Sequence, residues 1–188
     1  MRFDGVDDYV ELNQSLRDPN TFGGTFNGKS SISLWIYPTR EVGVDGETIL
    51  RRIGGLHYLE YSSDVDRRLQ IMVRCNPANP PCHSGGNHWP RSYAVIPRDK
   101  WTHVIFVLEP GVGWRFYIDG KLDRAESVPQ VVIIDYGGPS RLGYKLTESY
   151  ANFEGMMDNV RVYADALSSS QAKALYEKEK PKYILASF

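Results

Sequence analysis

At 188 residues, the chain is long enough to bury roughly 70% of its unfolded surface, so we expect a single domain over residues 1–188 with one sizeable core. Its 22 Lys and Arg residues against 23 Asp and Glu residues leave a net charge of -1, and the absence of a basic run argues against nucleic acid as a partner. The longest apolar runs, at residues 104–108 and 131–134, are far shorter than the ~18 to 20 residues needed to cross a bilayer.

Residues 2–12 lack the charged, apolar and small-residue regions of a signal peptide, so we expect either an intracellular protein or one domain of a longer secreted chain. Short segments with alternating polar and apolar residues then recur between clusters of Gly, Pro, Asp and Ser. This pattern is typical of antiparallel strands with one buried and one solvated face, and it predicts two sheets packed face to face. The predicted strands cover residues 8–12, 31–37, 47–53, 57–61, 68–74, 101–108, 114–119 and 158–163.

Both cysteines lie in a proline-rich segment after the predicted strand 68–74. Cys75 and Cys82 fit neither a four-ligand zinc site nor a Cys-x-x-Cys redox motif. A local disulfide between them is the favoured interpretation, with two free buried thiols as the alternative. The disulfide would stabilise the fold by only about 2–3 kcal/mol, but it would make the segment rigid and imply an oxidising compartment.

The last third of the chain contains a predicted hairpin and a predicted helix. Asp119 and Gly120 favour a two-residue turn, because both residue types tolerate positive φ. After the final strand, a serine among residues 168–170 can cap a helix with an apolar stripe, and we expect Pro181 to end that helix. The helix would act as a C-terminal clasp on the sheets.

Five segments carry a family resemblance: FDGVDDYVEL (3–12), SISLWIYP (31–38), KWTHVIFVL (100–108), WRFYIDGKL (114–122) and FEGMMDNVRVYADALSSSQAKALY (153–176). In this order they resemble the signature segments of laminin-G-like domains in the concanavalin A-like jelly-roll superfamily, and they span nearly the whole chain. The resemblance implies an all-β fold, a two-sheet antiparallel jelly-roll β-sandwich with a short C-terminal helix.

The resemblance also suggests a metal site. In the resembling families the first and last strands lie side by side, which would bring Asp4 of the first strand near Asp158 of the last. Carboxylates gathered in this way suit a hard cation such as Ca²⁺. We therefore predict a structural calcium ion held by Asp4 and Asp158, with Asp7 and Asp8 as further candidates. The alternative is that these groups only accept turn amides or face solvent.

Catalytic motifs are missing from the sequence. The β-glucan hydrolases of the resembling superfamily carry Glu-x-Asp-x-Glu on one strand, whereas Glu41 and Asp45 are four residues apart in a Gly-rich segment. Neither a Gly-x-Ser-x-Gly elbow nor a His-Glu-x-x-His motif is present. We therefore expect no enzymatic activity, with a glycan hydrolase as the residual alternative.

The segment that holds the cysteines is longer than the corresponding connection in the resembling domains. It brings together aromatic, amide, imidazole and guanidinium groups that suit a sugar, because a flat ring can stack on a pyranose while the polar groups bind hydroxyls. The alternative is that Trp89 only covers the sheet edge. The candidate ligand-binding residues are Asn87, His88, Trp89, Arg91, Tyr93 and, from the strand 57–61, His57.

The sequence thus predicts a non-catalytic recognition or adhesion domain, extracellular or at the cell surface, that binds carbohydrate or a protein partner through loops at the ends of the sandwich. A second hypothesis is a structural role, as the outer domain of a pilin-like surface filament or adhesin subunit that associates with its neighbours. The apolar tail PKYILASF (181–188) favours this second hypothesis, since it follows a helix with no evident core left to fill.

Overall fold

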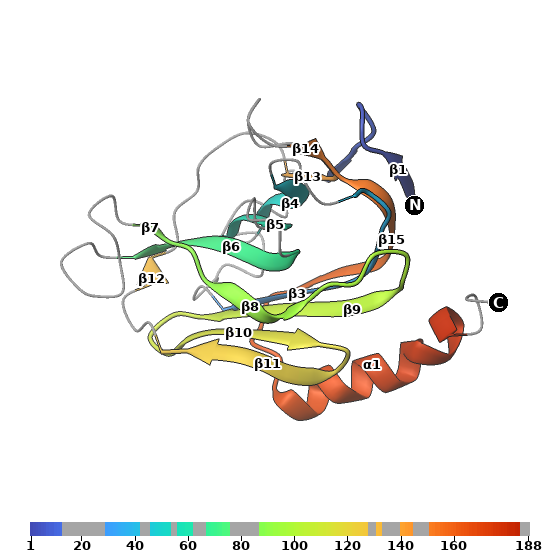
Figure 1. Cartoon of the computed structure of the whole chain (residues 1–188). Coiled ribbons are helices and arrows are strands. Elements are labelled where there is room, and N and C mark those ends of the chain that lie inside the picture. Colours follow the sequence, from blue (N-terminus) through green and yellow to red (C-terminus); the bar gives the residue numbers. More distant parts are fainter. Residues whose placement is uncertain are drawn as a thin grey trace.

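The computed structural model describes residues 1–12, 29–41, 46–53, 56–61, 67–75, 87–127, 131–132, 140–144 and 151–184. Within these residues the chain forms two β-sheets that face each other, with one helix against the outside of one sheet (Figure 1). The predicted all-β sandwich with a short C-terminal helix is confirmed.

One sheet has six antiparallel strands and contains both the first and the last strand of the chain. The pairing of β1 with β15 confirms that these two strands are neighbours. In spatial order the sheet comprises β1 (Arg2–Asp4), β15 (Glu154–Tyr163), β3 (Ser30–Pro38), β9 (Thr102–Glu109), β10 (Gly113–Ile118) and β11 (Lys121–Glu126).

The other sheet has nine strands within the described residues. Its main order is β12 (Val131–Val132), β6 (Arg68–Cys75), β5 (Leu56–Tyr61), β4 (Glu47–Ile53), β13 (Ser140–Leu142) and β2 (Val10–Leu12). Three more strands join this path: β14 (Ala151–Asn152) pairs in parallel with β4, and β7 (Asn87–His88) and β8 (Arg91–Val95) pair with β6.

All eight predicted strands are present, with boundaries shifted by a few residues. The predicted hairpin is also confirmed, since Asp119 and Gly120 have φ values of 48° and 72° and connect paired residues Ile118 and Lys121. A Cβ at Gly120 would meet the side chain of Tyr176 at 2.8 Å, so the turn rests directly on the helix. Strands β1, β7 and β12–β14 have only two or three residues each, too few to leave an alternating pattern, and β8 was not predicted either.

The predicted alternation of one buried and one solvated face fails for the central strands. Every residue of β3 except Tyr37 is buried, and in β9 only Glu109 is partly exposed. One face of these strands packs into the core between the sheets, where Leu34 and Phe106 are 0% and 1% exposed. The other face is covered by the C-terminal helix, α1 (Ser169–Ile184), so it too lies away from water.

Helix α1 begins at a capping box and extends past its proline. Ser168 Oγ accepts the Gln171 amide at 3.3 Å, and Gln171 Oε1 accepts the Ser168 amide at 2.8 Å. The expectation that Pro181 ends the helix is wrong, because α1 contains Pro181 and continues to Ile184. The last turn is held by Tyr183, which is 3% exposed and stacks on Trp35 with ring centroids 4.0 Å apart.

This packing also corrects the interpretation of the tail. Its first four residues, 181–184, are helical and supply the buried Tyr183, so they do fill part of the core; residues 185–188 lie outside the described part. Within the described residues, no helix has both the length and the apolar character that a bilayer crossing requires.

Polar groups are buried between α1 and the six-stranded sheet. Glu179 accepts a hydrogen bond from Trp35 Nε1 at 2.7 Å and forms an ion pair with Arg161. His103, on β9, is fully buried, stacks on Trp35 and shares a hydrogen bond of 2.9 Å with Ser33 Oγ. Burial, with a smaller contribution from the charge of Arg161, lowers the pKa of His103 to about 4.

His103 should therefore make the free energy of unfolding depend on pH. As the pH falls from 6.5 to 4, the unfolded chain binds a proton at His103 while the native protein does not, so stability decreases across this window and no further below it. The expected loss is up to about 3 kcal/mol. The free energy of unfolding, measured with urea across this pH range, should decline less steeply with falling pH for His103→Gln than for the wild type. Because the two proteins share all other titrating groups, equal pH slopes would contradict the expectation.

Candidate functional site

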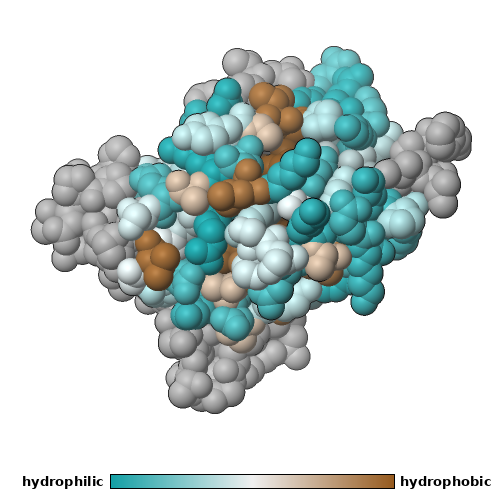
Figure 2. Space-filling model, turned by 90° about the horizontal axis from the view of Figure 1, so that it is seen from below, coloured by the Kyte–Doolittle hydropathy of each residue, from teal (hydrophilic) through white to brown (hydrophobic). Residues whose placement is uncertain are grey.

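Exposed apolar side chains lie on both β8 and β11, two strands that contact each other. Tyr93 and Val95 on β8 are 62% and 52% exposed, and Leu122 on β11 is 53% exposed. With Arg124, these residues are called the β8–β11 face below. Figure 2 views the molecule from the side that carries α1 and the β10–β11 hairpin, and hydrophobic residues lie there among hydrophilic ones. Such a group of exposed apolar side chains is a candidate contact surface.

The guanidinium of Arg124 lies between two aromatic rings. Its Cζ is 5.0 Å from the ring centroid of Tyr93 and 5.5 Å from that of the buried Trp114. Arg124 also donates a hydrogen bond to the Arg91 carbonyl at 2.9 Å and lies 3.6 Å from Glu126. The cation thus supports Tyr93 from one side by a cation–π contact, while more than half of the tyrosine remains exposed.

Asp123 fixes the neighbouring backbone of β8. Its two carboxylate oxygens accept the amides of Tyr93 and Ala94 at 2.7 and 2.8 Å. Each of these is a charge-assisted hydrogen bond, stronger than one between neutral groups. The position of Tyr93 is therefore set from both ends, by Asp123 at its backbone and by Arg124 at its ring.

The structure separates the predicted ligand-binding residues into exposed and internal ones. Tyr93 and Trp89 reach the surface, with Trp89 37% exposed. His88 is buried, lies 3.3 Å from Glu126 and packs near Trp114, and Arg91 Nε donates to Gln70 Oε1 at 2.6 Å. Asn87 and His57 belong to β7 and β5, but their side chains, like Cys82 and the predicted Cys75–Cys82 disulfide, lie outside the described residues.

A groove of about 670 Å³ opens beside the β8–β11 face. It lies between the β10–β11 turn and α1, and Ala94, Leu122 and Asp123 connect it with the strands. The volume falls within the range of sites for small ligands. Its charged lining residues are Asp119, Lys121, Asp123, Lys173, Glu177 and Lys180.

The sequence did not predict that β11 and α1 contribute to this surface. The Asp119-Gly120 turn did predict that a strand returns after it. The contact of this strand with β8, made by Leu122, Asp123 and Arg124, depends on how the two sheets meet. The local sequence pattern contains no signal for that contact.

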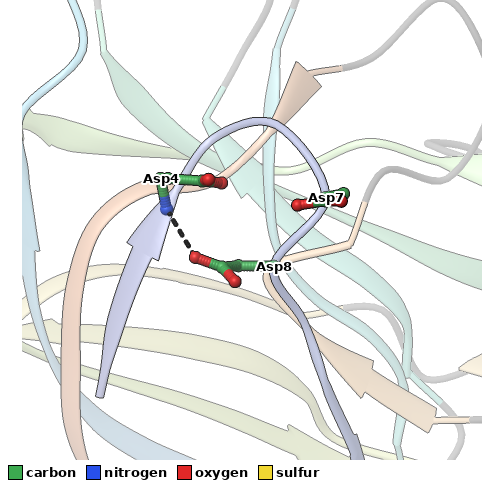
Figure 3. Close-up of side chains that lie close together, drawn as sticks. All are labelled: Asp4, Asp7 and Asp8. Atoms are coloured by element: carbon green, nitrogen blue, oxygen red, sulfur yellow. Dashed lines mark hydrogen bonds between the residues drawn. The ribbon is translucent and has the colours of Figure 1, made fainter.

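Three of the predicted metal ligands converge in the loop between β1 and β2. Asp4, Asp7 and Asp8 offer one carboxylate oxygen each, all within 4.8 Å of one another, and the side chains point into the loop (Figure 3). Calcium–oxygen distances of about 2.3–2.6 Å allow ligands on opposite sides of one ion to be about this far apart. The carboxylate set therefore fits a calcium ion in size and chemistry.

The same carboxylates also hold the loop by themselves. Asp4 Oδ1 accepts the Val6 amide at 2.8 Å, and Asp8 Oδ2 accepts the Asp4 amide at 3.0 Å. The Val6 amide is the main reason why the pKa of Asp4 lies below its usual value. Arg40 anchors the loop from inside, donating to the Gly5 carbonyl at 3.1 Å and pairing with Glu47 at 3.0 Å.

Asp158 does not join this cluster, so the expected meeting of Asp4 and Asp158 is wrong. Although β1 and β15 pair, their register sets Asp4 opposite Glu154, and Asp158 lies four residues further along β15. At ~3.3 Å per residue this separates the two aspartates by roughly 13 Å. Asp158 forms an ion pair with Lys182 of α1 instead.

Comparison with known proteins places this architecture in a family. Residues 4–173 match the sequence model of a family described as the concanavalin A-like lectin/glucanases superfamily. The chain is also 26% identical over 153 residues to the adhesion G-protein coupled receptor V1 of Danio rerio. That match covers 79% of this chain and only 2% of the receptor.

Solved structures share the fold. Domain 4 of an extracellular arabinanase from Geobacillus stearothermophilus, in complex with arabinotriose, superposes with a TM-score of 0.55 at 21% identity, covering 79% of this chain and 66% of the other. A structure of botulinum neurotoxin type C, whose cell entry depends on two ganglioside molecules, superposes with a TM-score of 0.62 at 15% identity. The match covers 90% of this chain and 39% of the toxin chain. At these identities the likeness concerns the fold alone. By the match over residues 4–173, the chain belongs to the laminin-G-like family of the concanavalin A-like lectin/glucanases superfamily.

Proposed function

We propose that this chain is a non-catalytic recognition domain that binds carbohydrate at the β8–β11 face. The observation that carries the proposal is the exposed ring of Tyr93, backed by Arg124 and fixed in place by Asp123. A flat aromatic ring can stack on the C–H face of a sugar, and little conformational entropy is lost when the ring is already held. The guanidinium of Arg124, which lies against this ring, can donate hydrogen bonds to sugar hydroxyls.

The relatives support a binding role. The arabinanase domain is in complex with arabinotriose and the neurotoxin depends on gangliosides, so domains of this fold occur in sugar-dependent recognition. The likeness to an adhesion receptor supports an extracellular or cell-surface location and leaves a protein partner as the alternative ligand. A Cys75–Cys82 disulfide would agree with that location.

Replacing Tyr93 with alanine should weaken carbohydrate binding. Removal of a central aromatic contact costs more than about 1.4 kcal/mol, which corresponds to a loss of tenfold or more in affinity. The measurement is a glycan array followed by calorimetry on the sugars it identifies. Tyr9→Ala is the matched control. Tyr9 is also exposed, at 46%, and its ring also contacts an arginine, with Arg141 Cζ 4.6 Å from the ring centroid, but it lies elsewhere in the molecule.

Three results would count against this assignment. Equal affinities of wild type and Tyr93→Ala would remove the β8–β11 face as the site. Binding to proteins but to no sugar on the array would favour the protein partner. Release of reducing sugar from mixed β-glucans by the wild type would show the chain to be the hydrolase that its sequence motifs argue against.

We also propose that Asp4, Asp7 and Asp8 hold a structural calcium ion. A ligand that binds only the native state adds about 2.7 kcal/mol at a hundred times its dissociation constant, which for this size means a rise of several degrees in Tm. Thermal unfolding in EDTA and in millimolar CaCl₂ should show this rise for the wild type and for Asp158→Asn, which lies outside the cluster. Asp7→Asn should abolish it; an unchanged Tm of the wild type would leave the three aspartates as loop residues only.

A further inference from the structure

We infer that the groove between the β10–β11 turn and α1 is a second sugar subsite, so that the domain binds a stretch of a polysaccharide chain and not a single terminal sugar. The inference rests on the proposed function of the β8–β11 face and extends it to residues of the C-terminal helix. It gives α1 a role in recognition besides its packing on the sheet.

The groove begins one residue away from Tyr93 along β8. Ala94 and Leu122, which line the groove, are the chain neighbours of Tyr93 and of Asp123, and Asp123 itself binds the amides of Tyr93 and Ala94. Adjacent residues of a strand point to opposite faces, so the Tyr93 ring and the groove lie on the two sides of β8. A ligand that reaches both must pass around the edge of this strand. A linear chain of sugars is a ligand that can occupy an aromatic platform and an adjoining groove at the same time.

The groove is large enough to hold a sugar unit. A volume of about 670 Å³ lies in the middle of the range of roughly 300–1,000 Å³ that holds drug-sized ligands, so the groove has room for at least one whole sugar unit beyond the unit on Tyr93. The groove walls come from rigid elements, because Gly120 of the turn is in contact with Tyr176 of α1. The shape is therefore largely present before a ligand binds.

The groove is lined by charged residues of both signs. The six charged lining residues comprise three lysines, Lys121, Lys173 and Lys180, and three carboxylates, Asp119, Asp123 and Glu177. Their formal charges cancel, so the groove does not select an anion or a cation. Hydroxyl groups both donate and accept hydrogen bonds, and alternating ammonium and carboxylate groups satisfy both functions. This chemistry favours the hydroxyl-rich units of a neutral polysaccharide.

The test is a chain-length series. Binding of arabino-oligosaccharides and cello-oligosaccharides, from the monosaccharide to the hexasaccharide, is measured by calorimetry. We expect affinity in at least one series to rise tenfold or more from the monosaccharide to a plateau at longer chains. A tenfold increase in NaCl concentration should leave this affinity unchanged, because contacts to a neutral ligand are not screened by salt.

Variants on α1 assign the gain in affinity to the groove. Lys173→Ala/Glu177→Ala removes one exposed charge of each sign from the lining and should abolish the gain with length while leaving monosaccharide binding intact. Lys178→Ala is the matched control, an exposed lysine of the same helix outside the lining, and it should retain the gain.

The outcomes separate the two proposals. Length-independent binding that Tyr93→Ala abolishes would overturn the second subsite and leave the proposed function standing. A gain with length that survives in Lys173→Ala/Glu177→Ala would also overturn it, by placing the longer chain elsewhere. Absence of binding in both series would overturn the inference, and unchanged binding by Tyr93→Ala would overturn the proposed function beneath it.

Discussion

The candidate surface depends on how the two sheets meet at β8 and β11. Within the described residues no backbone pairing joins these strands, and the side chains of β11 provide the connection: Asp123 binds two amides of β8, and Arg124 binds the carbonyl of Arg91. An exposed strand edge is prone to pair with other chains, and a carboxylate that occupies its amides prevents this. The same two side chains hold Tyr93 at the surface. One set of contacts therefore protects the edge of β8 and positions the tyrosine that we propose binds the sugar.

Helix α1 has a comparable double role. Its buried side covers Trp35 and His103, so both faces of β3 and β9 lie away from water. Buried polar groups are tolerated there because Glu179 is paired with Arg161 and receives the Trp35 hydrogen bond. The adjoining flank of the helix, which includes Tyr176, forms one wall of the groove. Docking of the helix is therefore a precondition for the second subsite.

The loop of Asp4, Asp7 and Asp8 is independent of this surface. Arg40 and the side chain of Asn152 bind the Gly5 and Val6 carbonyls from inside, so the loop keeps its shape through contacts of the protein alone. A bound calcium ion would then add stability by offsetting the mutual repulsion of three neighbouring carboxylates, and it would have no part in shaping Tyr93 or the groove. Calcium dependence and carbohydrate binding are thus expected to be separable properties.

The sequence by itself determined the family, the long strands and the Asp119-Gly120 turn, because alternation and turn chemistry are local properties of the chain. It also named Tyr93 as a candidate ligand-binding residue and Asp4, Asp7 and Asp8 as candidate metal ligands, and both assignments remain predictions. Only the tertiary structure decided that His88 is internal, that Arg124 supports Tyr93 and that Asp158 lies far from Asp4. Those facts depend on strand register and on sheet contacts between residues distant in sequence, and a local pattern does not encode the partner that a strand or helix will meet.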